Sequence, residues 1–205
     1  NEDEEVNHCI RCEYHNRHAT HSPIGCAVNP FAGRELEYPE GVVPEAPVKK
    51  KVLVVGGGAA GLSAAVAAAD AGAHVLIVER EDELGGILQQ CIHNGFGLHT
   101  FNEELSGPAY AEKYFDLIKD NECIKVIYDA TVIQIKDKTL KVQTPKGLKL
   151  IETEAIVIST GCRERPAGAI GLKGNRCEGV YTAGTAQKYL NKEGYLVGKK
   201  VFILG

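Results

Sequence analysis

The 205-residue sequence contains no methionine and no long run of apolar residues. Because a natural gene product begins with methionine, we expect a processed piece or a fragment of a longer chain. No apolar stretch approaches the roughly 20 residues that cross a membrane. The polar residues 1–7 do not resemble a signal peptide. The sequence therefore predicts a chain without a membrane span.

A basic surface and a disulfide framework are also missing. The formal net charge is -4, which argues against a dedicated nucleic-acid surface, since neutralising phosphates takes a basic patch. The seven cysteines are an odd number and accompany no secretory signal, so they do not indicate paired disulfides. With 44% hydrophobic and 24% charged residues, the composition is that of a globular protein, which we expect in the reducing cytoplasm.

Residues 52–80 contain the most informative pattern, a strand, a glycine-rich turn, a helix and a second strand. Residues 52–55 are apolar and predict a buried parallel strand. An Ala-rich helix is expected to run to about Asp70, and a second apolar strand, residues 75–78, ends at Glu79. This order of elements is typical of a βαβ unit that binds a dinucleotide.

The glycines of this turn have separate physical roles. In a G-x-G-x-x-G turn, Gly56 makes the tight bend, Gly58 lets the backbone approach a pyrophosphate, and Gly61 lets helix and strand pack closely. The helix N-terminus holds the phosphate charge, and Glu79, about 20 residues further on, accepts hydrogen bonds from the ribose hydroxyls. The neighbours of these positions are also predicted to bind the cofactor, namely Ala59, Ala60 and Arg80.

From residue 51 onward the pattern predicts an α/β, Rossmann-like domain. After the βαβ unit and a mixed loop over residues 88–108 come a helix over 109–119 and a strand over 124–128. Three alternating segments predict an antiparallel β-meander, followed by one more apolar strand; these segments are residues 131–135, 140–144, 148–152 and 155–159.

Residues 49–205 resemble the FAD-binding half of the two-dinucleotide-binding flavoproteins, the group that includes the pyridine-nucleotide disulfide reductases. Gly85 and Gly86 follow Glu79 as in that family, where the backbone approaches the flavin-side phosphates. The resemblance further implies that Thr160 and Gly161 meet the FAD and that Val132 touches its adenine. It implies FAD as the cofactor and NAD(P)H bound by a second domain.

Residues 197–205 repeat the pattern of residues 48–56, in which lysines precede four apolar residues and a glycine. We therefore expect the chain to stop in the first strand of a truncated NAD(P)-binding domain, with a generic buried strand as the alternative. The predicted organisation is a Cys/His-rich segment and linker over 1–47, an FAD-binding domain over 48–196, and this first strand over 197–205.

Residues 85–97 and 181–187 look like the bacterial FAD-dependent oxidoreductases of the glycerol-3-phosphate dehydrogenase type. Disulfide reductases of this fold carry a Cys pair close behind the double glycine or in the second domain, but here only Cys91 follows closely. Direct flavin–disulfide exchange is therefore not expected. Cys91 and His93 could act in catalysis, although a packed thiol and a satisfied polar side chain are the favoured interpretation.

The N-terminal segment combines cysteines with prolines and shows no helical or strand period, so a metal or a host domain must hold it. It resembles the iron–sulfur linker of the Old Yellow Enzyme-like flavoproteins of the dienoyl-CoA reductase and trimethylamine dehydrogenase type. In that family four cysteines hold a 4Fe–4S cluster, whereas here His15 stands in place of one of them. The candidate ligands are Cys9, Cys12, His15 and Cys26. An iron–sulfur cluster, a Cys3His zinc site and no metal all stay open.

These resemblances imply an FAD-dependent oxidoreductase. Electrons would pass from NAD(P)H through FAD to the iron–sulfur cluster, and on to an FMN domain upstream or another electron-transfer partner, for a small-molecule redox substrate. The alternatives are a non-catalytic ADP- or FAD-binding module with a zinc clip, and a glycerol-3-phosphate dehydrogenase-like oxidoreductase without an FMN barrel. The sequence identifies no catalytic residue.

Overall fold

A computed structural model of the chain describes residues 48–175 and 177–204. The chain divides into two units, Asn1–Glu45 and Ala46–Gly205, and the structure described below is that of the second. Its helices and strands are, in chain order, β1 (Lys51–Val55), α2 (Ala59–Asp70), β2 (His74–Val78), the 3-10 helix η2 (Gly86–Gln90), β3 (Asn94–Phe96), β4 (Leu105–Ser106), α3 (Gly107–Lys119), β5 (Ile124–Ile127), β6 (Thr131–Lys136), β7 (Thr139–Thr144), β8 (Gly147–Glu152), β9 (Ala155–Ile158) and α4 (Ala183–Asn191).

A four-stranded parallel sheet in the order β5-β2-β1-β9 forms the centre of this unit. Strand β1 lies between β2 and β9, and its Val54 pairs with Ile77 on one side and with Val157 on the other. These strands consist almost entirely of apolar residues because both faces of the sheet are covered. The predicted α/β Rossmann-like fold is confirmed.

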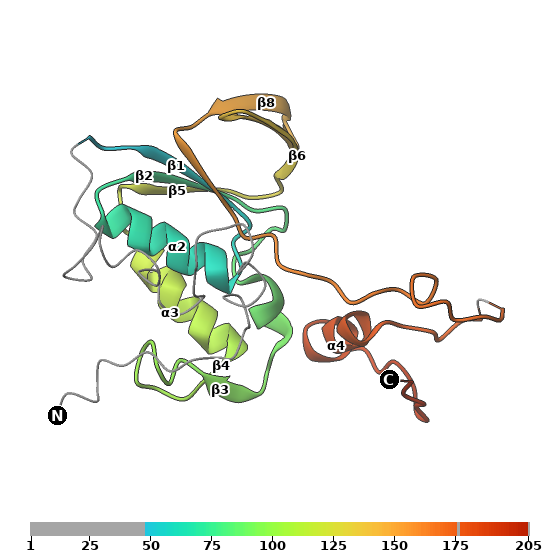
Figure 1. Ribbon diagram of the computed structural model, residues 1–205. Coiled ribbons are helices and arrows are strands. Elements are labelled where there is room, and N and C mark those ends of the chain that lie inside the picture. Colours follow the sequence, from blue (N-terminus) through green and yellow to red (C-terminus); the bar gives the residue numbers. More distant parts are fainter. Residues whose placement is uncertain (1–47, 176, 205) are drawn as a thin grey trace, which may run out of the picture. The chain divides into compact units, whose positions relative to one another are not determined.

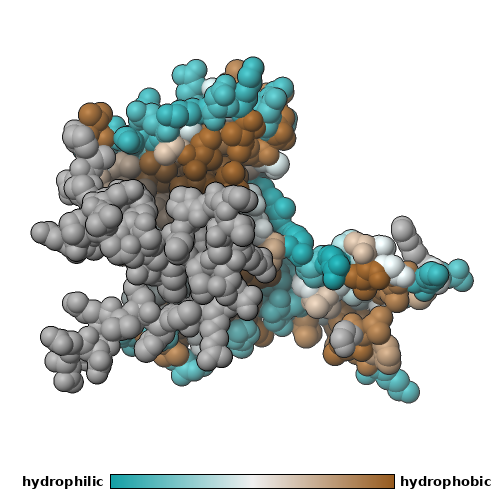
Figure 2. Space-filling model, viewed as in Figure 1, coloured by the Kyte–Doolittle hydropathy of each residue, from teal (hydrophilic) through white to brown (hydrophobic). Residues whose placement is uncertain are grey.

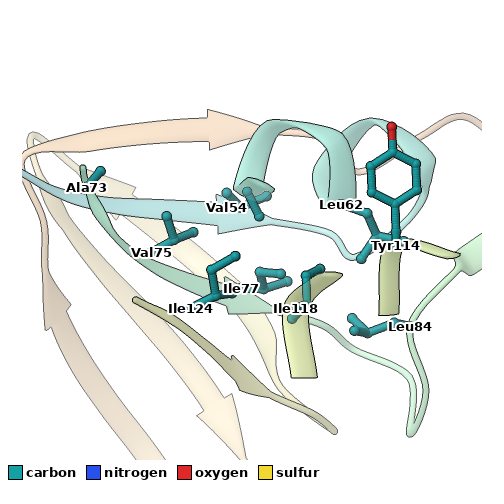
Figure 3. Packing of buried hydrophobic residues seen from close by; sticks show 10 residues of the cluster. Val54, Leu62, Ala73, Val75, Ile77, Leu84, Tyr114, Ile118 and Ile124 are labelled. Atoms are coloured by element: carbon teal, nitrogen blue, oxygen red, sulfur yellow. The ribbon is translucent and has the colours of Figure 1, made fainter. Parts of the chain in front are cut away.

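Helices α2 and α3 cover one face of the parallel sheet (Figure 1). Alternate strand residues point toward them, since successive side chains of a strand face opposite ways. Figure 3 shows Val54, Ile77 and Ile124 of the sheet packed with Leu62 of α2 and Ile118 of α3. This layer forms the larger of the two apolar clusters and holds the start of α2 in place.

The antiparallel meander β6-β7-β8 covers the opposite face of the sheet (Figure 1). Leu53, Val55 and Val78 of the sheet pack there against Leu140 and Val142 of β7. Figure 2 shows hydrophilic residues along the top of the molecule, over the meander, with hydrophobic residues beneath them. In β7 the alternating pattern matches burial, since Leu140 and Val142 are buried, whereas the apolar Ile133 of β6 and Leu150 of β8 are exposed.

Helix α2 ends where the sequence predicts, at Asp70. Gly72 follows it with φ of 85°, in the left-handed region. The Gly72 N–H donates to the Ala69 carbonyl, and the Ala73 N–H donates to the Ala68 carbonyl. This pair of hydrogen bonds is the Schellman arrangement, which satisfies the last carbonyl groups of a helix and favours glycine at its turn.

Helix α4 was not predicted from the sequence. Helix α4 has nine residues and buries none of them. Residues 201–204 carry no strand and are exposed. That residues 197–205 begin an NAD(P)-binding domain stays a prediction. None of the helices in the described ranges is long and apolar enough to cross a membrane.

The two clusters predict where substitutions destabilise the fold. Ile77 is fully buried, so Ile77→Ala should lower the free energy of unfolding by about 2–5 kcal/mol through lost burial and a cavity. The same change at Ile170, which is 51% exposed, should cost less than about 1 kcal/mol. Urea unfolding followed by circular dichroism measures both, and equal losses would contradict the packing described here.

Candidate functional site

The candidate site lies at the carboxyl ends of β1, β2 and β9. The chain proceeds from β1 to β2 and β5 on one side of the sheet, and β9 then adds to the other side of β1. The strand order therefore reverses at β1, and parallel α/β sheets bind ligands in the crevice at such a switch point. The predicted cofactor residues Gly56 and Glu79 directly follow β1 and β2, and Thr160 follows β9 by two positions.

Gly56 forms a turn that has no room for a side chain. Its φ is 99°, and a Cβ at this position would lie 2.5 Å from the Ser159 carbonyl oxygen. A Cβ at Gly61 would lie 1.9 Å from the Gly56 carbonyl oxygen. The Ser159 hydroxyl lies 2.9 Å from the carbonyl oxygens of Val55 and Gly56 and can donate its proton to either. The first turn of α2 is thereby packed tightly against the ends of β1 and β9.

Gly58 differs from these glycines because open space surrounds it. A Cβ built there would meet no atom within 4 Å, and its φ of -76° is accessible to any residue. Gly58 is the N-cap of α2 and provides no side-chain hydrogen bond to the helix. The first N–H groups of an α-helix have no partner within the helix, and the helix dipole adds partial positive charge there. The start of α2, with Ala59 and Ala60, thus offers hydrogen-bond donors to an anion.

The Glu79 carboxylate lies beside this turn and is nearly buried, with 5% of its surface exposed. One of its oxygens accepts a hydrogen bond from the Gly57 N–H at 2.6 Å, and the other accepts one from the Glu81 N–H at 2.9 Å. Burial, and after it the negative charge of Glu79, raises the pKa of Tyr128 above its ordinary value. Each carboxylate oxygen can accept a further hydrogen bond, so Glu79 can still bind a hydroxyl group.

The double glycine lies against the Gly56–Gly58 turn. The Gly85 N–H donates to the Gly57 carbonyl oxygen at 2.8 Å, and Gly85 has φ of 104°. A Cβ at Gly86 would lie 3.2 Å from the Gly58 Cα. The structure therefore brings the two glycine motifs together, although Gly58 and Gly85 lie 27 positions apart in the chain.

The remaining predicted cofactor residues lie at different distances from this centre. Thr160 is adjacent to it, because its Cα would lie 3.3 Å from a Cβ at Gly56. Val132 is half-buried and packs against the cluster that contains Val55 and Val78. Gly161 is exposed with φ of 68°, and Arg80 is exposed with its side chain paired to Glu81. The cofactor contacts of all these residues stay predictions.

Gly57 also belongs to the site, although the sequence pattern did not single it out. Its N–H binds Glu79, and a Cβ at this position would lie 2.4 Å from the Leu84 side chain. The run of three glycines was the available signal, but the G-x-G-x-x-G pattern treats its middle position as variable. Ser159, which ends the apolar segment 155–159, also belongs to this turn, because its hydroxyl lies 2.9 Å from the carbonyl oxygens of Val55 and Gly56.

The predicted metal ligands Cys9, Cys12, His15 and Cys26 lie outside the described residues. Within the described ranges, no group of three or more His, Cys, Asp or Glu side chains could hold a metal ion. The cysteines found free there are Cys91, Cys123, Cys162 and Cys177. Cys91 is half-buried and His93 is exposed, and nothing in their contacts assigns either of them a catalytic role.

Relatives of this chain are found among flavin and nicotinamide enzymes. NADH oxidase of Thermoanaerobacter brockii is 46% identical over 88 residues, which are 42% of this chain and 13% of that protein. Cinnamate reductase of Clostridium sporogenes is 28% identical over 204 residues, which are 98% of this chain and 26% of that protein. Sarcosine oxidase subunit alpha of a Corynebacterium species is 30% identical over 171 residues, 76% of this chain and 17% of that protein. The chain thus spans only a small part of the curated relatives that it matches.

A solved structure and a family model also match this chain. The crystal structure of L-proline dehydrogenase from P. horikoshii matches with a TM-score of 0.61 at 21% identity, over 74% of this chain and 30% of that one. At this identity the likeness speaks for the fold alone. The family model described as pyridine nucleotide-disulphide oxidoreductase matches residues 46–205, which are most of the chain. The chain therefore belongs to the pyridine nucleotide-disulphide oxidoreductase family, whose members are FAD-dependent oxidoreductases.

Proposed function

We propose that this chain binds FAD and serves an oxidoreductase that passes electrons from NAD(P)H through FAD to an iron–sulfur cluster and a further flavin or acceptor. The observation that carries the proposal is the open helix start at Gly58 beside the nearly buried carboxylate of Glu79. The helix start suits a pyrophosphate and the carboxylate suits a ribose, and a dinucleotide contains both groups.

The residues of the site fit FAD on several counts. Space is open at Gly58, where the backbone must approach a pyrophosphate closely. At Gly56 and Gly61 the space for a side chain is occupied by other protein atoms. Glu79 is held by two backbone N–H groups, so a ribose hydroxyl would meet an acceptor that is already oriented. The adjoining Gly85–Gly86 turn lies where the second half of a dinucleotide diphosphate would run.

Each part of the site has a separate task in this proposal. When bound, FAD would accept two electrons together and release them one at a time, which NAD(P)H and the protein's side chains do not do. The N–H groups at the start of α2 hold the phosphates, and Glu79 orients the adenosine ribose. Thr160 and Gly161 lie where the chain leaves β9, and Val132 belongs to the meander strand proposed to contact the adenine. NAD(P)H as the electron donor agrees with the family, whose description names pyridine nucleotides.

The iron–sulfur part of the proposal rests on the first 47 residues. The alignment with cinnamate reductase covers 98% of the chain and so extends into the segment that contains Cys9, Cys12, His15 and Cys26. This supports a reductase in which that segment and the FAD-binding domain occur together. Thiolates are the preferred ligands of iron–sulfur clusters, and a zinc site with the same ligands is the competing assignment. The proposal further includes a cytoplasmic location, a small-molecule redox substrate, and an FMN domain or electron-transfer subunit as the recipient.

Substitutions at Gly58 and Gly61 should separate binding from folding. Gly58→Ala places its methyl group in open space, so the free energy of unfolding should change by less than about 1 kcal/mol. The same methyl group would displace a pyrophosphate from the helix N–H groups, lowering FAD affinity about tenfold or more, since hydrogen bonds to charged groups contribute about 1.5–3 kcal/mol each. Flavin fluorescence titration measures the affinity.

Gly61→Ala is the matched control, since its methyl group would collide with the Gly56 carbonyl oxygen. This variant should lose about 1–3 kcal/mol of stability or more. If Gly58→Ala binds FAD as tightly as the unchanged protein, the pyrophosphate does not lie at this turn.

Glu79→Gln tests the proposed ribose contact. The new amide group must face the N–H of Gly57 or of Glu81, so one donor loses its acceptor. We expect a loss of about 1–3 kcal/mol in stability and about tenfold in FAD affinity. Glu81→Gln removes a half-exposed carboxylate of the same loop and should change the stability by less than about 0.5 kcal/mol. Equal effects of the two variants on FAD affinity would argue against a special role for Glu79.

Metal analysis tests the iron–sulfur assignment. Protein purified without oxygen should contain iron and sulfide, and dithionite reduction should produce an electron paramagnetic resonance signal. Cys9→Ala should abolish that signal by removing a thiolate ligand, whereas Cys177→Ala, at an exposed free cysteine, should leave it unchanged. Stoichiometric zinc without iron would contradict the cluster and indicate a structural zinc site instead.

A further inference from the structure

Helix α4 lacks the apolar contacts that usually hold a helix in place. It has nine residues, none of them buried, and its Leu190 is 51% exposed. Isolated helices of this length are unstable in water, so specific contacts must keep it formed. At its start the Thr182 hydroxyl accepts a hydrogen bond from the Thr185 N–H, and the Glu164 carboxylate accepts one from the Gly184 N–H at 2.9 Å.

The side chain of Gln90 provides the main link between α4 and the rest of the domain. Gln90 is buried, with 9% of its surface exposed, and it is the last residue of η2. Its Nε2 donates to the Gln187 Oε1 at 2.9 Å and to the Gly184 carbonyl oxygen at 3.2 Å. Its own carbonyl oxygen accepts a hydrogen bond from the Asn191 Nδ2 at 2.8 Å. Residues 184, 187 and 191 share one face of a helix, so Gln90 binds that face along its length.

Two weaker contacts surround this link. The Gln187 Nε2 lies 4.0 Å from the Cys91 sulfur. Lys192, just after α4, forms an ion pair with Glu83 in the loop before η2, and this hydrogen bond raises the pKa of Lys192 above its ordinary value. Both groups of the ion pair are partly exposed, so we expect it to contribute less stability than the partly buried hydrogen bonds of Gln90.

The opposite end of η2 belongs to the proposed FAD site. This helix begins at Gly86, next to Gly58, and Gly85 is bonded to Gly57. One short helical segment therefore contacts the nucleotide turn at its first residue and α4 at its last. A ligand that fixes Gly86 also fixes Gln90, because only one and a half helical turns separate them.

We propose that Gln90 is a positioning residue that fastens α4 to η2, so that FAD binding and attachment of α4 stabilise each other. The coupling rests on the proposed function, since it requires a dinucleotide at Gly58 and Gly86. The linkage is reciprocal: if FAD stabilises the attached form of α4 by some factor, detaching α4 weakens FAD binding by the same factor. Bound cofactor thereby strengthens the attachment of α4 and of the chain that follows it.

Hydrogen exchange of the α4 amides, measured with and without FAD, tests this coupling. In the unchanged protein, saturating FAD should slow exchange across residues 183–191 by about fivefold or more. Gln90→Leu keeps the size of the side chain but removes its donor. It should abolish this FAD-dependent slowing and weaken FAD binding by a similar factor, while leaving one FAD bound per chain.

Two variants serve as controls. Gln143→Leu makes the same change in the meander, where the Gln143 side chain donates to the neighbouring Thr144 carbonyl, and it should retain the full FAD effect. Thr182→Ala removes the helix cap, so α4 should exchange faster both with and without FAD, but the ratio of the two rates should persist. This ratio distinguishes coupling from a change in helix stability alone.

The outcomes separate this inference from the proposed function. If the unchanged protein binds no FAD, the proposed function is overturned, and the coupling with it. If FAD binds but slows α4 exchange equally in Gln90→Leu and in the unchanged protein, only the role of Gln90 is overturned. Loss of the FAD effect in Gln90→Leu but not in Gln143→Leu or Thr182→Ala supports it.

Discussion

The site depends on one steric constraint, the absence of room for a Cβ at the end of β1. The Gly56 turn is packed between the end of β9, at Ser159, and the first turn of α2, at Gly61. Contacts this close fix the N-terminus of α2 against the sheet to within a fraction of an ångström. Because the helix start is the source of the N–H donors, this packing decides where an anion binds. The close contacts are made at Gly56 and Gly61, so the space beside Gly58 stays free for a ligand.

The carboxylate of Glu79 adds a second constraint at the same place. Burying a carboxylate without partners is costly, but both oxygens of Glu79 accept backbone hydrogen bonds, from Gly57 and Glu81. The hydrogen bond to Gly57 joins the end of β2 to the turn after β1, so the group proposed to bind ribose also orders the turn proposed to bind phosphate. Recognition and local stability therefore use the same atoms.

The described unit combines a packed part with a part held by polar contacts. The parallel sheet, helices α2 and α3, and the meander bury two apolar clusters on opposite faces of the sheet. Helix α4 buries none of its residues and depends on Gln90, the Thr182 cap and exposed charged groups. Segments held in this way open at lower free energy than a core does, and moving elements are drawn from them. The rigid part carries the proposed FAD site, and the loosely held part leads to residues 197–205.

The sequence alone determined the order of strands and helices in the packed part, together with Gly56, Gly58, Gly61 and Glu79. Local apolar periods and turn glycines specify these features directly. Tertiary structure decided the rest: the hydrogen bond from Gly57 to Glu79, the hydrogen bonds of Ser159, and the attachment of α4 through Gln90. Each of these features depends on contacts between residues far apart in the chain, and no local pattern records such contacts.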